Sequence, residues 1–170
     1  MKRQHLALEA LKHILTDEIQ TRFKSNIVKQ RQFSEMLLQA LKKYKNKSIE
    51  AARIIEELIA TAKEMKADAD QTAAFDMTSN EVAFYDALVM NGSAREVLGD
   101  DKLRDLARVL VQRVRANTSV DWSIREPARA RLRVEVKRLL REYGYPPDAE
   151  KVATELVLEQ TERFVVTDQN

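Results

Sequence analysis

The segment from Asp121 to Asp148, DWSIREPARARLRVEVKRLLREYGYPPD, constrains the fold most strongly because it carries every signal of one long helix. Pro127 suits the first helical turn, where a missing backbone N–H removes no hydrogen bond. Gly144, followed by two prolines, marks the end of the helix. Apolar residues recur at helical spacing and predict a buried face made of Leu132, Val136, Leu139, Leu140 and Tyr143. The sequence therefore predicts an amphipathic helix over about Ile124 to Tyr143.

The same helix carries a winding stripe of cations spaced four residues apart: Arg125, Arg129, Arg133, Lys137 and Arg141. Like charges at this spacing repel by roughly 0.2–0.5 kcal/mol per pair in an isolated helix, so an anionic group should lie nearby. Arg131 and Arg138 add to the charge of the helix. The candidate residues for contacting a partner or DNA are therefore Arg125, Arg129, Arg131, Arg133, Lys137, Arg138 and Arg141.

The net charge of +2 is unevenly distributed along the chain. Residues 1–48 carry a net +7, residues 49–101 a net −8, residues 102–147 a net +7 and residues 148–170 a net −4. Two interpretations stay open. Basic helices could pack beside acidic ones, with Glu155, Glu159 and Glu162 neutralising the stripe, or a basic face could be offered to DNA or an acidic protein surface. The sequence pI of about 8.8 falls slightly below the value typical of nucleic-acid-binding domains.

The whole chain favours helices, because its 170 residues include only three glycines and three prolines. Periodicity predicts an all-α fold of seven or eight helices in a bundle-like array with no sheet, and Ala69 to Met77 is expected to form a loop. Expected buried positions include Ile59 in the third helix and Val152 in the last. Thr78 and Glu81 have the spacing of a capping box. The expected helices cover about 6–24, 27–45, 49–68, 79–90, 94–98, 101–117, 124–143 and 147–166.

One domain spanning 1–170 is expected, with a soft boundary near 69–77 that separates a long-helix unit, 1–68, from a second helical unit, 78–167. The charged N-terminal segment does not have the pattern of a signal peptide, and no run is long and apolar enough to span a membrane. The chain has no cysteine, which excludes disulfides, a thiolate nucleophile and Cys-type zinc sites. We therefore expect a cytoplasmic protein with no membrane partner.

Signatures of catalysis are missing from the sequence. Its three glycines are isolated, so a GxxxxGK[ST] phosphate loop and a GxSxG nucleophile elbow are both excluded. His5 and His13 are interpreted as surface residues rather than metal ligands. Glu64 and Lys66 have the spacing of one part of a nuclease motif, but on a helix and without a partner aspartate. Trp122, Phe84 and Tyr85 are interpreted as core aromatics, and Tyr143 to Pro147 as a helix stop with packed tyrosines.

Five runs resemble the C-terminal helical region of the restriction (R) subunit of type I restriction–modification enzymes. The resemblance depends on their order and spacing, and it covers about residues 27–160. The runs are VKQRQFSEMLLQALKKY (28–44), SIEAARIIEELIATAKE (48–64), TSNEVAFYDAL (78–88), LGDDKLRDLARVLVQRVRAN (98–117) and DWSIREPARARLRVEVKRLLREYGYPPD (121–148).

The resemblance implies a part of a larger machine. In that family the R subunit has a Mg²⁺-dependent nuclease domain and two ATP-driven translocase domains, followed by a helical region thought to dock the subunit onto the methyltransferase. We therefore expect part of a longer polypeptide, with Met1 arising from a truncated reading frame or supplied with an expressed fragment. ATP and Mg would belong to the parent subunit, and no cofactor or metal is expected in this part. Residues 163–170 match nothing that we can place.

The leading hypothesis is a non-catalytic assembly module that joins the motor–nuclease part to the methyltransferase and specificity subunits. DNA threading between these parts would be a further contact. The alternative is a helical module that binds the DNA backbone through the basic helix, residues 125–141, without reading bases. A metal-dependent nuclease acting alone is a third possibility, which would require plasmid cleavage with Mg²⁺; we expect none.

Overall fold

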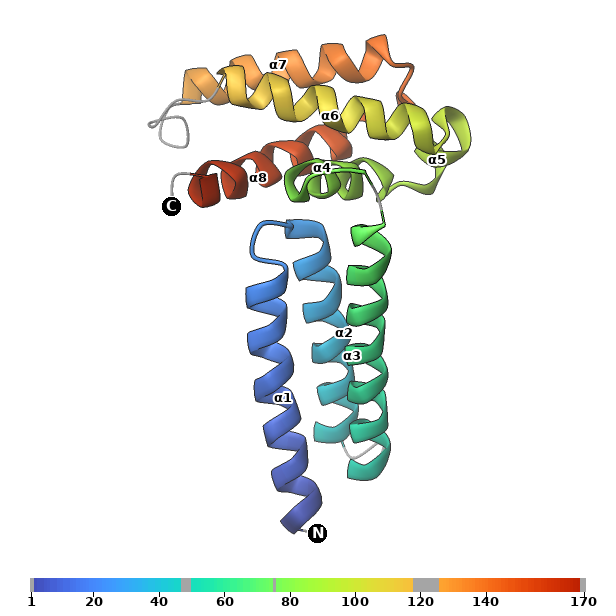
Figure 1. The fold of residues 1–170 in the computed structure, drawn as a ribbon, viewed down its shortest axis with the longest axis vertical. Coiled ribbons are helices and arrows are strands. Elements are labelled where there is room, and N and C mark those ends of the chain that lie inside the picture. Colours follow the sequence, from blue (N-terminus) through green and yellow to red (C-terminus); the bar gives the residue numbers. More distant parts are fainter. Residues whose placement is uncertain (1, 47–49, 75, 118–125, 169–170) are drawn as a thin grey trace. The chain divides into compact units, whose positions relative to one another are not determined.

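The chain folds into α-helices throughout its described part. The structure, a computed structural model, describes residues 2–46, 50–74, 76–117 and 126–168. Within these ranges it contains eight helices and no strand, which confirms the predicted all-α fold (Figure 1). The helices are α1 (Lys2–Arg22), α2 (Ile27–Lys45), α3 (Ala51–Ala73), α4 (Ser79–Val89), α5 (Gly92–Leu98), α6 (Asp100–Asn117), α7 (Glu126–Glu142) and α8 (Glu150–Asp168).

The chain divides into two compact units. Unit 1 comprises Met1–Lys24 and Lys29–Asp76, and unit 2 comprises Ser25–Val28 and Met77–Asn170. The short turn between α1 and α2 therefore belongs to unit 2, although the helices on either side of it belong mainly to unit 1. That the two units act as a single domain stays a prediction.

Unit 1 is built from three long helices, of which consecutive ones run in opposite directions (Figure 1). Each contributes one apolar seam to a shared core, and α1 packs against α3. The rings of Phe23 and Phe33 stack with their centroids 5.0 Å apart beside the α1–α2 turn. The buried core of unit 1 consists of Leu8, Leu15, Ile19, Phe23, Phe33, Leu37, Ala40, Ile54, Leu58 and Met65.

Helix α3 corrects two expectations from the sequence. It continues to Ala73, so the loop expected from Ala69 is wrong over its first five residues. Alanine favours helix even where the apolar pattern fades, and Asp68 near this end pairs with Lys29 of α2 at 2.6 Å. The buried line of α3 is Ile54, Leu58, Thr61 and Met65. Ile59 is exposed because it lies about 100° around the helix from Leu58.

Unit 2 is organised around α4, which is buried on all sides from Val82 to Leu88. The helix packs against α5, α6 and α8, while α7 packs against α6 and α8. The predicted capping box holds its first turn: the Thr78 N–H donates to Glu81 Oε1 at 2.8 Å, and the Glu81 N–H donates to Thr78 Oγ1 at 3.2 Å. A short helix that is apolar all round needs this cover from several neighbours.

The seam of α6 agrees fully with the sequence prediction. Its buried residues are Leu103, Leu106, Ala107, Leu110, Val111 and Val114. For α8 the expectation is partly wrong, because Val152 is exposed. The buried line instead begins at the next residue, Ala153, and continues through Val157 to Phe164. Phe84 and Tyr85 are buried as predicted.

The chain reverses between α7 and α8 through a Schellman motif. Gly144 has φ of +77°, a left-handed conformation that glycine adopts without strain. The Gly144 N–H donates to the Arg141 carbonyl at 3.0 Å, and the Tyr145 N–H donates to the Leu140 carbonyl at 2.9 Å. These two bonds satisfy carbonyls at the end of the helix. The Tyr145 hydroxyl donates to the Leu88 carbonyl at 2.7 Å, so this turn is also hydrogen-bonded to α4.

The side chain of Gln160 holds the α1–α2 turn within unit 2. Its Oε1 accepts from the Ile27 N–H at 2.9 Å, and its Nε2 donates to the Ser25 carbonyl at 2.5 Å. Gln160 is fully buried and Ser25 is half-buried, so the buried Ile27 N–H in particular depends on this side chain for its hydrogen bond. Asn26 adds a hydrogen bond of 2.8 Å from its Nδ2 to Asp86 of α4. None of the described helices has both the length and the apolar character needed to cross a membrane.

Candidate interaction surface

The basic helix predicted from the sequence is α7, and its apolar face lies in the core of unit 2. Leu132, Val136, Leu139 and Leu140 are buried as predicted, and Tyr143 is half-buried. The cations of the stripe therefore lie on the faces of α7 that point away from this core. Arg125, and with it Val120 and Trp122, falls outside the described residues.

Three cations of the stripe pair with carboxylates of α8. Arg133 Nε lies 2.9 Å from Glu155 Oε1, and Arg129 pairs with Glu162. Near the other end, Arg141 contacts Glu150 through both Nε and a terminal nitrogen, at 3.1 Å each to Oε1. Rising numbers on α7 meet falling numbers on α8, as two antiparallel helices require. Each pair removes one positive charge from the stripe.

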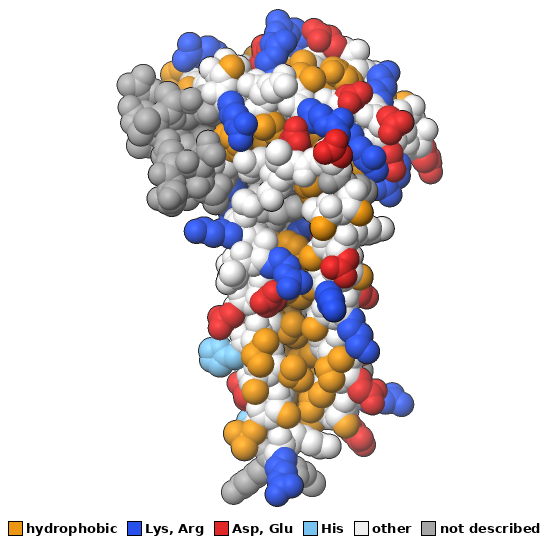
Figure 2. All heavy atoms as spheres, viewed as in Figure 1, with side chains coloured by type: hydrophobic (Ala, Val, Ile, Leu, Met, Phe, Trp, Pro, Cys, Tyr) orange, Lys and Arg blue, Asp and Glu red, His pale blue; other side chains and the backbone are white. Residues whose placement is uncertain are grey.

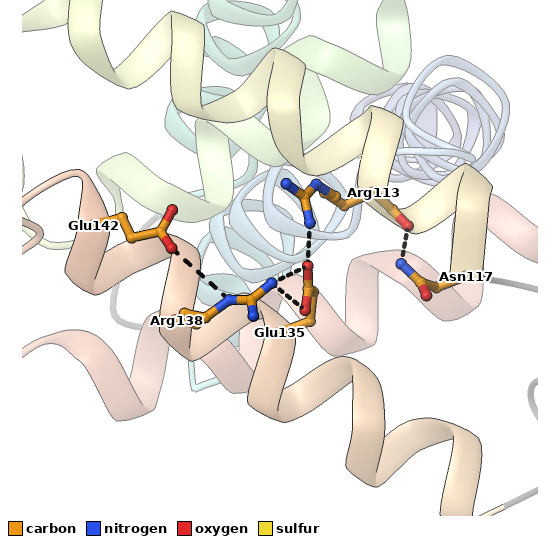
Figure 3. Close-up of polar contacts among 5 residues, drawn as sticks. All are labelled: Arg113, Asn117, Glu135, Arg138 and Glu142. Carbon is orange, nitrogen blue, oxygen red and sulfur yellow. Dashed lines mark hydrogen bonds and ion pairs between the residues drawn. The ribbon is translucent and has the colours of Figure 1, made fainter.

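Glu135 neutralises charge between α6 and α7 (Figure 3). One of its oxygens pairs with Arg113 of α6, and both accept from Arg138 at 2.8 Å. Arg138 Nε also lies 3.8 Å from Glu142, one turn further along α7. Sequence reasoning did not assign Glu135 this role, although its position three residues before Arg138 is a spacing at which side chains on one helix meet.

The other two described candidates have a different environment. Among the described residues, neither Arg131 nor Lys137 has an ion-pair or hydrogen-bond partner. Arg131 is exposed, and Lys137 is half-buried at the edge of a pocket. Internal pairing thus accounts for Arg129, Arg133, Arg138 and Arg141, in agreement with neutralisation inside the domain. Contact of any candidate residue with a partner or DNA stays a prediction.

Figure 2 shows Lys, Arg, Asp and Glu side chains intermixed on the viewed face of unit 2, whereas hydrophobic side chains gather along unit 1. The mixture agrees with the pairs described above, because each basic side chain of α7 that pairs has a carboxylate beside it. Surface ion pairs of this kind each contribute roughly 0–1 kcal/mol. Their main effect here is to reduce the electrostatic repulsion between neighbouring cationic side chains of α7.

A second polar cluster joins α4, α5 and α6. The Tyr85 hydroxyl donates to Asp100 Oδ1 at 2.8 Å and accepts from Arg95 at 3.0 Å, while Arg95 Nε lies 3.2 Å from Asp100. Burial raises the pKa of Tyr85, and the hydrogen bond with Tyr85 raises the pKa of Arg95. The hydroxyl therefore stays protonated and serves as a structural link at physiological pH.

The histidines interpreted as surface residues are exposed, and His5 Nδ1 lies 3.4 Å from the Tyr44 hydroxyl. The described residues include no group of three His, Asp or Glu side chains that could hold a metal ion. The surface of the described part is hollowed at several places. One pocket lies at the α7–α8 turn with about 590 Å³, one between α2 and α3 with about 380 Å³, and one between α1 and α2 with about 170 Å³.

Comparison with known proteins places this all-helical chain in the context of restriction enzymes. It is 32% identical over 161 residues to the type I restriction enzyme HindI endonuclease subunit of Haemophilus influenzae, covering 95% of this chain and 15% of that protein. It is 31% identical over 142 residues to a provisionally named type I restriction enzyme MjaIXP endonuclease subunit of Methanocaldococcus jannaschii, covering 80% of this chain and 13% of that protein.

The profile of the family described as "Type I restriction enzyme HindI endonuclease subunit-like, C-terminal" matches residues 1–167. The chain belongs to this family, which confirms the resemblance seen in the sequence. It spans well under a quarter of the length of the two relatives. No solved structure matches the chain.

Proposed function

We propose that this chain is a non-catalytic docking module of a type I restriction endonuclease subunit, which joins the motor–nuclease part to the methyltransferase and specificity subunits. The observation that carries the proposal is the match of a C-terminal family over residues 1–167. The names of the relatives assign the endonuclease role to proteins of which this chain covers 15% and 13%. An assembly role fits a region that makes up so small a share of the whole subunit.

The surface chemistry supports docking over the DNA-backbone alternative. Four of the seven candidate cations are paired with carboxylates of the same chain, which weakens the attraction of α7 for phosphates. Exposed large hydrophobic side chains, by contrast, occur in both units and suit a protein partner. Six of them are between 61% and 68% exposed: Leu6, Ile14, Met90, Val97, Val134 and Val152.

The decisive experiment is calorimetric titration of the chain into its cognate methyltransferase–specificity complex, with and without DNA. We expect saturable binding without DNA, since a docking contact between proteins does not need it. Binding that occurs only with DNA and weakens steeply with salt would favour the backbone-binding alternative. Absence of saturable binding under both conditions would contradict the docking role.

Two pairs of substitutions would locate the docking face. Leu6→Glu with Ile14→Glu changes unit 1, and Val134→Glu with Val152→Glu changes unit 2. All four positions are exposed, so the fold should tolerate the charges. Gln71→Glu with Gln112→Glu is the matched control, because it adds the same charge at exposed polar positions. The pair that weakens binding more than the control identifies the docking unit.

A further inference from the structure

The pocket at the α7–α8 turn has an unbalanced charge. It is lined by three cations, Lys137, Arg141 and Lys151, and by one carboxylate, Glu150. It is open to the surface and has a volume of about 590 Å³, which leaves room for a small anionic group. The Schellman reversal at Gly144 brings the start of α8 beside the last turns of α7, so residues from both helices reach the same cavity.

The one carboxylate of the pocket is already engaged. Glu150 is about nine-tenths buried, and its oxygens accept from Arg141 Nε at 3.1 and 3.3 Å. The Arg141 charge is therefore cancelled by Glu150. Among the described residues, Lys137 and Lys151 have no ion-pair or hydrogen-bond partner. Two positive charges, on the half-buried Lys137 and the exposed Lys151, are left uncompensated at one open pocket, in a unit whose other basic residues on α7 are mostly paired.

The excess positive charge of the pocket favours an anionic ligand. A phosphate monoester carries about −1.5 to −2 charge at pH 7 and offers three acceptor oxygens, which matches two ammonium groups. Lysine is a common phosphate-binding residue, acting as a point charge. The positive end of the α8 dipole at Glu150 adds to the same field. The Tyr145 hydroxyl donates its proton to the Leu88 carbonyl, so the anion would be held by the cationic side chains and not by this hydroxyl.

We propose that Lys137 and Lys151, with Arg141 held by Glu150, form a binding site for a phosphate group. This site goes beyond the docking function and does not depend on it, because the chain alone contains all the residues. Two sources share the chemistry. A free phosphate compound would enter the pocket as a small ligand, whereas a DNA phosphodiester would approach it from the surface.

The test has two arms, both on the isolated chain. Inorganic phosphate is titrated while amide shifts are followed by NMR, and a short labelled DNA duplex is titrated by fluorescence anisotropy at several salt concentrations. Saturable shifts between residues 137 and 151 with inorganic phosphate identify a free-phosphate site. A response only to the duplex identifies the phosphodiester as the source.

The variant Lys137→Ala with Lys151→Ala should weaken binding about tenfold or more, a loss of about 1.4 kcal/mol. In the DNA arm it should also reduce the salt slope by about 2, or about 1 for each lysine. Lys63→Ala with Lys66→Ala is the matched control, because it removes the same charge from exposed positions of α3. Lys137→Arg with Lys151→Arg should keep binding.

If the alanine variant does not fold, as judged by circular dichroism, Lys137→Gln with Lys151→Gln replaces it and retains part of each aliphatic chain. The proposal is overturned if neither probe gives a saturable response at these residues. It is equally overturned if removal of the two lysines leaves binding as strong as in the control.

Discussion

The two units of this chain are stabilised in different ways. Unit 1 consists of three long helices around one apolar core, and the hydroxyls of Thr16 and Thr61 donate to backbone carbonyls of their own helices. In unit 2, Thr154 and Thr161 bond within their own helix in the same way, but two buried side chains also reach distant backbone. Gln160 contacts residues 25 and 27, and Tyr145 contacts residue 88. Unit 2 therefore depends on contacts between segments that are far apart in sequence.

Because of this difference, the apolar pattern of the helices explains the packing of unit 1 better than that of unit 2. An apolar seam tolerates volume-conserving changes along its length. A buried polar contact leaves both partners unsatisfied when one side is removed. The α1–α2 turn is held in unit 2 by both kinds of contact, because Ile27 and Val28 also lie in its apolar core. The predictions below test this contrast, beginning with the separate apolar cores of the two units.

The largest expected effect comes from the apolar core. Leu110→Ala in unit 2 and Leu58→Ala in unit 1 should each lower the free energy of unfolding by about 2–5 kcal/mol, because both side chains are fully buried and leave a cavity. Urea unfolding followed by circular dichroism measures the loss. Leu38→Ala, at an exposed position, is the control and should change little. A loss under about 1 kcal/mol would mean that the seam is wrongly assigned.

The next largest effect is expected to differ between the two units. Gln160→Leu should lower the free energy of unfolding by about 1–3 kcal/mol, because the Ile27 N–H and the Ser25 carbonyl lose their buried partner. Hydrogen exchange of the Ile27 amide should accelerate as well. Thr61→Val in unit 1 is the comparison, because that hydroxyl donates only to the carbonyl of Glu57 in its own helix. Equal effects of the two changes would remove the contrast between the units.

The ion pairs between α7 and α8 should give a smaller effect. Arg129→Glu with Arg133→Glu places like charges beside Glu162 and Glu155, and should lower stability by about 1–2 kcal/mol since partly exposed pairs are weak. Adding Glu155→Arg and Glu162→Arg should restore the melting temperature. Lys102→Glu with Arg131→Glu, at exposed positions, is the charge-matched control. An unchanged melting temperature would mean that the stripe does not neutralise α8.

The smallest effect at neutral pH is expected at the helix stop. Tyr145→Phe removes the hydrogen bond to the Leu88 carbonyl and should lower stability by about 1 kcal/mol. Tyr143→Phe, two residues earlier and half-buried, is the control.

Alkaline pH should enlarge the role of Tyr145. Burial, with a contribution from Asp148, raises the pKa of Tyr145 to about 12. The unfolded state releases this proton first, so the stabilisation is complete below about pH 10 and is lost as pH rises through about 12. Urea unfolding in steps above pH 10 should show a shallower decline for Tyr145→Phe. An identical decline in both proteins would contradict this assignment.

Helices and their seams were largely predictable from the sequence because they follow from local spacing. Leu103 to Val114 in α6, the capping box at Thr78 and the stop at Gly144 all have the predicted form. Errors occurred where neighbours, not spacing, decide burial. Val152 is exposed because it lies about 100° around α8 from the buried Ala153. Helix α3 continues to Ala73 although its apolar pattern ends earlier.

The candidate surface was less predictable. The sequence showed a stripe of cations and suggested that carboxylates of the last helix could neutralise it. Only the fold selects Glu155 and Glu162, adds Glu135 and Glu150, and leaves Lys137 without a described partner. The spacing of charges on one helix does not reveal which neighbouring helix supplies the carboxylates that pair with them.

The sequence by itself determined the helical class, most helix bounds and membership of a restriction-enzyme family, because these depend on short-range periodicity and on the order and spacing of a few runs of residues. The tertiary structure alone decided that the turn at residues 25–28 belongs with unit 2. It also decided which charges cancel and where two lysines share a pocket. Ion pairs and buried hydrogen bonds act over a few ångströms, so they depend on which segments the fold brings together.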